Sequence, residues 1–149
     1  MLHTEELDSL DKKIFHMGGL AEHNLGQAFD ALINRNPHLA YSVISADADI
    51  DQLQIDIEKH IVTMMAQNNT TDSDIRNIMA CLKIAGDLER IGDLAKNIAK
   101  RVVAIVGQAY PRPLIVGIQN MLERALSQLK DVLDAYTCLL YTSPSPRDA

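Results

Sequence analysis

The sequence has 149 residues, of which 47% are hydrophobic and only 4% aromatic, and its formal net charge is −6. A chain of this length and apolar content forms one compact domain, or one domain and part of another, so disorder along the whole chain is excluded. The negative charge and the absence of Lys/Arg runs argue against a nucleic-acid partner, and no apolar run is long enough to span a bilayer. An all-α protein is expected, because Ala, Leu, Ile and Met dominate and Trp is absent. A cytoplasmic location is expected because the sequence shows no export signal or membrane anchor.

Three long helices are predicted in the first part of the chain. Apolar residues recur every three or four positions over residues 5–34, and Asn36 followed by Pro37 marks the start of a second helix that continues to about residue 67. Thr71, with Asp74 three residues later, is a capping-box signature for a third helix that starts near residue 72. Short polar turns force antiparallel neighbours, so residues 1–107 are predicted to form an antiparallel three-helix bundle.

A fourth amphipathic helix is predicted after the connector GQAYPRP. Its pattern partly repeats that of the first helix, so residues 108–138 are expected to be the first helix of a second, incomplete bundle. The chain is therefore expected to be a fragment. Residues 139–149, with two Ser-Pro pairs, resemble translated sequencing-adapter read-through and are expected to be a non-native tail.

The third predicted helix carries two apolar stripes. Advancing about 100° per residue from Ile75 keeps one set of side chains near a single meridian, namely Met79, Leu82, Gly86, Glu89 and Asp93. A second apolar stripe starts at Ile84 on the opposite side. The pattern predicts that this helix changes its buried face near residues 84–90, which would leave Glu89 and Asp93 on a polar strip outside the bundle interior. Gly86 and Gly92 are predicted to allow close approach of another helix.

Two rows of carboxylates are candidate metal ligands. Glu89 and Asp93 lie one helical turn apart and offer oxygen ligands of the kind that Mg²⁺, Mn²⁺ or iron prefer. Asp47 and Asp51 form a similar row that flanks the apolar seam of the second helix. The rows would make one site only if they converge, within the bundle or across a dimer. The alternative is an ordinary solvated acidic surface, with Asp93 paired to Lys96 or Asn97.

Four segments resemble, in order, motifs of the PhoU family of phosphate-signalling proteins: MGGLAEHNLGQAFDAL, DADIDQLQIDIE, DIRNIMACLKIAGD and LERIGDLAKNIAK. The resemblance extends over residues 5–138. It implies a tandem pair of three-helix bundles, homodimeric when full length, and a non-enzymatic cytoplasmic adaptor. The implied partners are a phosphate ABC transporter, whose uptake it restrains, and a sensor histidine kinase, which it keeps inactive. Membrane association would then occur only through these partners.

The resemblance also implies a metal site. Some family members bind multinuclear iron or zinc through a Glu/Asp-x-x-x-Asp motif, which in this sequence is Glu89 and Asp93. Asp47 and Asp51 are further candidates. The expected cofactor is a divalent or iron ion (Fe, Zn, Mg or Mn).

No catalytic residue is expected. Ferritin-like di-iron enzymes carry Glu-x-x-His on two helices, and no Glu here is followed by His at the third position. A GxSxG motif, a Gly-rich phosphate loop and a CxxC pair are also absent, and His60, which falls at a core position of the heptad pattern, is expected to be a structural histidine in the core or at its edge. Two alternatives to the regulator remain open: a metal-free helical scaffold or dimerisation module, and a metal-storing helical bundle.

Overall fold

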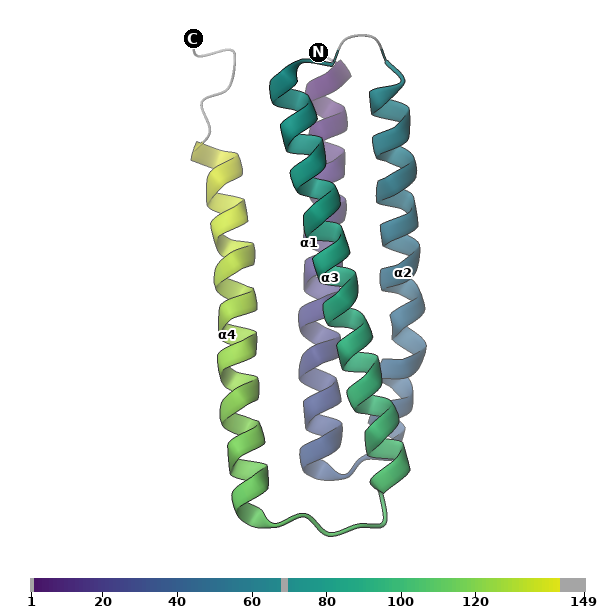
Figure 1. Cartoon of the computed structure of the whole chain (residues 1–149), viewed down its shortest axis with the longest axis vertical. Helices are drawn as coiled ribbons and strands as arrows, with labels where there is room; N and C mark the ends of the chain where they lie inside the picture. The colour runs from purple at the N-terminus through teal and green to yellow at the C-terminus, as the bar shows by residue number, and fades with distance from the viewer. Residues whose placement is uncertain (1, 68–69, 143–149) are drawn as a thin grey trace. The chain divides into compact units, whose positions relative to one another are not determined.

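The computed structural model describes residues 2–67 and 70–142, and within these ranges the chain is all-α (Figure 1). It contains four helices, α1 (Leu2–Asn34), α2 (Pro37–Met65), α3 (Asp72–Ile105) and α4 (Arg112–Thr142). The predicted number and order of the helices are confirmed. Among the described residues, no helix combines the length and apolar content that a membrane crossing requires.

A two-residue turn joins α1 to α2. Arg35 adopts a positive φ of 51°, and the Asn36 amide donates to the Ala31 carbonyl at 2.9 Å, as in a Schellman ending of α1. The Asn36 side chain then accepts from the Leu39 amide at 3.1 Å, with Pro37 as the first helical residue. Asn36 thus closes one helix and caps the next, as its sequence context predicts.

The start of α3 is a complete capping box. The Asp74 amide donates to the Thr71 hydroxyl at 3.2 Å, and the Thr71 amide donates to the Asp74 carboxylate at 3.0 Å. Two amides that lack partners within the helix are satisfied in this way, so α3 begins where the sequence predicts.

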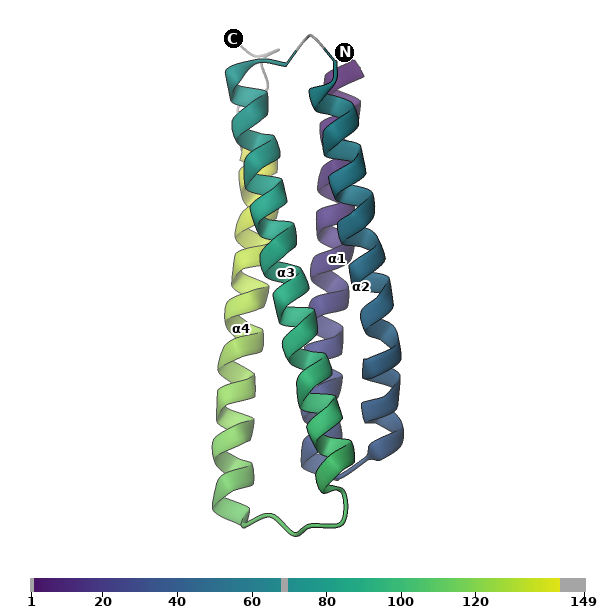
Figure 2. The ribbon, with the colours of Figure 1, turned by 45° about the vertical axis from the view of Figure 1, so that its right-hand side comes forward.

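Helices α1 and α3 run in one direction and α2 in the opposite direction, and the three pack together as a bundle (Figures 1 and 2). Each helix buries side chains that are alternately three and four residues apart. This spacing is typical of helices that pack with a small angle between their axes. The buried residues include Leu10, Ile14, Met17, Ala21, Asn24, Ala28 and Ala31 of α1, Ala40, Val43, Asp47, Ile50, Ile57, Ile61 and Met64 of α2, and Ile78, Cys81, Ala85, Leu88, Gly92, Ala95, Ala99 and Val102 of α3.

The predicted change of buried face within α3 is wrong. One stripe with regular spacing is buried along the helix, consisting of Ile78, Cys81, Ala85, Leu88, Gly92, Ala95, Ala99 and Val102. Met79 and Leu82, which the prediction placed on the buried face, are 64% and 43% exposed. The prediction failed because it assigned burial from apolar character, whereas large apolar side chains also occur on protein surfaces.

The chain divides into two compact units, with the boundary between Ala109 and Tyr110. The bundle forms the first unit, and α4 is the described helix of the second. Helix α4 continues to Thr142, beyond the predicted end of the helical pattern near Cys138. The division into residues 1–107 and 108–138 stays a prediction, as does the non-native tail 139–149, of which residues 143–149 lie outside the described residues.

Candidate metal centre

The bundle core contains two buried polar residues, Asn24 of α1 and Asp47 of α2, each only 2% exposed, and Gly92 of α3 lies against Asp47. We call these three residues the polar core layer. The hydrophobic pattern placed Asp47 beside the seam of α2, next to Ala46. In the structure Asp47 itself occupies the core position, while Ala46 is only half-buried. A buried polar group costs free energy unless it is paired, so the partners of Asp47 determine what this layer can do.

Gly92 makes room for Asp47. A Cβ atom on Gly92 would lie 3.0 Å from Ile50 Cδ1 and 3.3 Å from Asp47 Oδ1, so α2 and α3 approach here so closely that a side chain at this position would force these neighbours to shift. The predicted close approach is therefore confirmed at Gly92. It is wrong at Gly86, where an added Cβ would meet nothing within 4 Å.

Asp47 has one partner and one free oxygen. The Lys96 ammonium lies 3.1 Å from Asp47 Oδ2, an ion pair with α2 that differs from the alternative in which Asp93 pairs with Lys96 or Asn97. This hydrogen bond raises the pKa of Lys96. The other oxygen, Oδ1, is buried and has no hydrogen-bond partner among the described residues. Buried carboxylate oxygens are rarely left without a partner, so Oδ1 is an acceptor available to a cation.

The two carboxylate rows converge. Asp47, Asp51 and Asp93 each offer one oxygen, and these three atoms all lie within 4.8 Å of one another. Glu89 lies one helical turn before Asp93, and the charges of Asp93, Asp51 and Asp47 all act on it. We call these four residues the acidic cluster. Its members come from α2 and α3, so both helices are required to assemble it.

The electrostatics of the acidic cluster are those of crowded negative charge. The hydrogen bond with Asp93, burial and the charges of Asp93, Asp51 and Asp47 raise the pKa of Glu89 to about 7. Burial, followed by the charges of Asp47 and Asp93, also raises the pKa of Asp51, and Lys96 opposes this effect. A bound cation would relieve the repulsion that causes these shifts.

The donor set fits a hard cation. The cluster consists of carboxylates, the ligand type that Mg²⁺, Mn²⁺, Ca²⁺ and iron accept, whereas structural zinc sites are built mainly from Cys and His. Within the described residues, the acidic cluster includes neither of these zinc ligands. The free Oδ1 of Asp47 supports the fit, since a cation would supply its missing partner. The assignment of Glu89, Asp93, Asp47 and Asp51 as metal ligands stays a prediction.

Two polar residues of the bundle were not expected from the sequence, Asn24 in the core and Lys96 as the partner of Asp47. Asn24 is buried, and its amide Nδ2 has no hydrogen-bond partner among the described residues. Asn24 interrupts the apolar positions of α1 at a core spacing, which was the available signal. The role of Lys96 had no such signal, because its partner lies on another helix.

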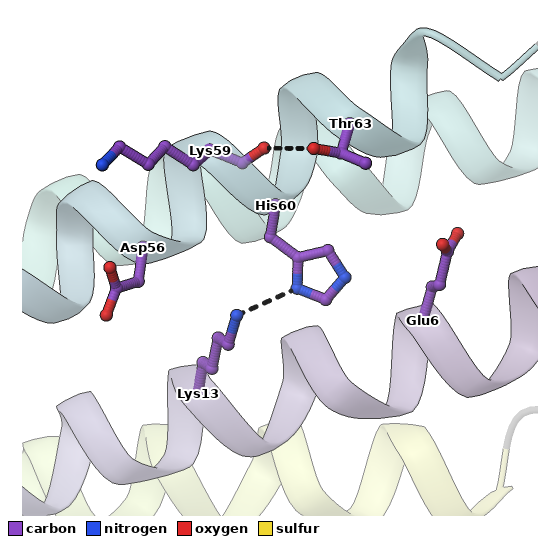
Figure 3. A pocket seen from close by; sticks show the side chains of 6 residues that line it. All are labelled: Glu6, Lys13, Asp56, Lys59, His60 and Thr63. Atoms are coloured by element: carbon purple, nitrogen blue, oxygen red, sulfur yellow. Dashed lines mark hydrogen bonds between the residues drawn. The ribbon is translucent and has the colours of Figure 1, made fainter.

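A second group of polar side chains lies between α1 and α2, around a contact between Lys13 and His60 (Figure 3). An open pocket of about 390 Å³ is lined there by Glu6, Lys13, Asp56, Lys59, His60 and Thr63. Lys13 Nζ lies 3.2 Å from His60 Nδ1, and burial, followed by the charge of Lys13, lowers the pKa of His60. His60 is half-buried, which agrees with its predicted position at the edge of the core.

Comparison with known proteins decides the family. The model of the PhoU domain matches residues 14–102, a range that includes α2 entirely and the whole acidic cluster. The chain belongs to the PhoU family. The PhoU domain thus spans the polar core layer and Lys96 as well.

Named relatives and one solved structure agree with this assignment. The chain is 43% identical over 145 residues to a phosphate-specific transport system accessory protein PhoU homolog of Rhizobium meliloti (strain 1021), covering 97% of this chain and 59% of the relative. It is 33% identical to the accessory protein PhoU of Escherichia coli (strain K12), covering 88% of this chain and 54% of the relative. The crystal structure of PhoU from Pseudomonas aeruginosa superimposes with a TM-score of 0.87 at 29% identity, covering 91% of this chain and 65% of that chain. The PhoU-like chain therefore spans little more than half the length of these curated relatives.

Proposed function

We propose that this protein is a non-enzymatic regulator of phosphate uptake and phosphate-starvation signalling. Its membership of the PhoU family carries the proposal, and its relatives are named as accessory proteins of a phosphate-specific transport system. In this proposal it acts in the cytoplasm as a homodimer and binds a phosphate ABC transporter and a sensor histidine kinase. The rigid bundle presents charged helix faces to these partners.

The test is genetic complementation with a chimera. Residues 1–138 of this chain would be joined to the remaining part of the Rhizobium meliloti relative and expressed in a bacterial strain that lacks its own PhoU protein. The proposal predicts that phosphate-starvation genes are again repressed when phosphate is plentiful. Continued expression of these genes, despite normal amounts of the chimera on an immunoblot, would contradict it.

The acidic cluster is proposed to bind a divalent or iron ion that adjusts assembly with the partners. Asp47 would hold the ion from the core side, and Asp51, Glu89 and Asp93 from the more exposed side. When bound, the metal would supply positive charge that links α2 to α3. Support comes from the three carboxylate oxygens within 4.8 Å and from the buried oxygen of Asp47, which has no hydrogen-bond partner in the described part of the chain.

Metal analysis separates this proposal from a metal-free scaffold. The purified chain would be compared with the Glu89→Ala/Asp93→Ala variant by inductively coupled plasma mass spectrometry and by calorimetric titration with Mn²⁺. Asp87→Ala is the matched control, because Asp87 is an exposed carboxylate on the same helix. The site predicts loss of metal in the double variant alone. Equal metal content in all three proteins would leave the scaffold as the better description.

A further inference from the structure

Lys96 occupies the position of a cation in the acidic cluster. Its ammonium lies 3.1 Å from Asp47 Oδ2, and the charges of Asp51 and Asp93 also act on it. The cluster therefore already contains one positive charge, supplied by the protein. A metal ion bound by Asp47 would have to lie at the position of this charge or close to it.

Asp47 needs this charge when no metal is bound. Its side chain is 3% exposed, and a buried carboxylate without a compensating cation is strongly destabilising. The Lys96 side chain is 31% exposed, so its ammonium can return to water by rotation of its flexible stem. One partner is fixed in the core, and the other can leave.

An ammonium and a divalent ion repel each other if both contact the same carboxylate. Binding of a metal to Asp47 would therefore be linked to the departure of Lys96. We propose that Lys96 is a tethered competitor that neutralises Asp47 in the metal-free protein and is displaced when a divalent cation binds. This inference rests on the proposed metal site and adds a determinant of its affinity.

The proposal makes opposite predictions for two substitutions. Lys96→Gln removes the competing charge, so Mn²⁺ binds about tenfold more tightly than in the wild type. Lys96→Arg keeps the charge and can bind a carboxylate through two nitrogens, so it resists displacement and weakens Mn²⁺ binding by about tenfold. Lys100→Gln is the control, because Lys100 is an exposed lysine one turn further along α3.

The experiment is calorimetric titration of the full chain and these three variants with Mn²⁺, with folding checked by far-ultraviolet circular dichroism. Tighter binding in Lys96→Gln and weaker binding in Lys96→Arg, with Lys100→Gln unchanged, is the expected result. Equal affinity in all four proteins would overturn the role of Lys96 and leave the metal site standing. Absence of binding in all four would overturn the metal site itself.

A second measurement does not depend on the folding of any variant. In the wild type labelled with ¹⁵N-lysine, titration with Mg²⁺ should shift the nuclear magnetic resonance signal of the Lys96 ammonium toward that of a solvent-exposed lysine. The other lysine signals should stay in place. A Lys96 signal that stays unchanged while Mg²⁺ binds would overturn the proposal.

Discussion

The contrast between Gly92 and Gly86 gives a direct test of the packing that assembles the acidic cluster. Both glycines lie within α3, where replacement of Gly by Ala stabilises a helix by about 1 kcal/mol through backbone entropy. At Gly86 the added methyl group meets nothing within 4 Å, so Gly86→Ala should raise the free energy of unfolding by about 1 kcal/mol.

At Gly92 the same methyl group meets the core. It would lie 3.0 Å from Ile50 Cδ1 and 3.3 Å from Asp47 Oδ1, and neither neighbour moves easily, since Ile50 is fully buried and Asp47 is held by Lys96. Overpacking of this kind costs about 1–3 kcal/mol, which exceeds the gain in helix propensity. Gly92→Ala should therefore lower the free energy of unfolding by about 1 kcal/mol, and the two variants should differ by about 2 kcal/mol.

The assay is urea denaturation of the full chain, followed by circular dichroism at 222 nm in the presence of EDTA. Gly86→Ala is the matched control, because it has the same chemistry on the same helix without the contact. An equal stabilisation by both substitutions would show that α2 and α3 do not approach closely at Gly92, and the geometry proposed for the acidic cluster would fail with it.

Four further predictions concern stability and are checked by the same denaturation assay. The pKa of Glu89 is raised to about 7 from 4.5, so the folded state holds a proton that the unfolded state has lost, and stability decreases as the pH rises from 4.5 through 7. In EDTA, Glu89→Gln should therefore be more stable than the wild type at pH 8, by about 1 kcal/mol after allowance for solvent screening. At pH 4.5 the two proteins should have similar stability. The same difference in stability at both pH values would contradict this prediction. The lowered pKa of His60 has the opposite effect on stability. The unfolded state binds the proton first as the pH falls, so stability is lost as the pH falls through 6.5. His60→Gln should flatten this pH dependence of stability, and an unchanged dependence would argue against the prediction. Arg35→Gly should stabilise the chain by about 0.5–1 kcal/mol, since glycine adopts a positive φ without steric cost, whereas Arg35→Ala should give no such gain. Thr71→Ala should destabilise it by about 1 kcal/mol through loss of the cap of α3, and Thr71→Ser, which keeps the hydroxyl, should recover most of that loss.

The helix ends could be predicted from the sequence because they depend on neighbouring residues. Asn36 with Pro37 and Thr71 with Asp74 act over three residues, and the structure contains the hydrogen bonds that these pairs imply. The order of the helices and the antiparallel packing followed from the short turns in the same way.

The buried face of α3 could not be predicted, because burial depends on the other helices. Several stripes of apolar residues run along this helix, and the bundle covers only the one that faces α1 and α2. An ideal helix also drifts by about 20° per heptad relative to a seam that repeats every seven residues, so a meridian drawn from Ile75 departs from the true core along the helix. Met79, which is 64% exposed, lies on that meridian and outside the core.

The acidic cluster depends both on spacing within one helix and on the packing of two helices. The spacing of Glu89 and Asp93 is local and was visible in the sequence, but their convergence with Asp47 and Asp51 depends on the register between α2 and α3. That register involves two helices and is not encoded in the spacing along either one, and the two helices approach each other closely at Gly92. A carboxylate in a core position also looks like an error in the apolar pattern, which is why Asp47 was assigned to the flank of the seam.

The polar core layer therefore has a structural cost that a purely apolar bundle would avoid. Asn24 and Asp47 each bury a polar atom that has no hydrogen-bond partner among the described residues, and Gly92 weakens its helix where alanine would strengthen it. Neighbouring core positions such as Ala21, Ile50 and Leu88 show that the same helices bury apolar residues. If stability alone determined this layer, Asn24→Leu combined with Asp47→Leu would fit the pattern of its neighbours. A ligand that needs a carboxylate at this depth gives the layer a reason to be polar, and a cation that displaced Lys96 from Oδ2 and bound both oxygens of Asp47 would also satisfy the free Oδ1.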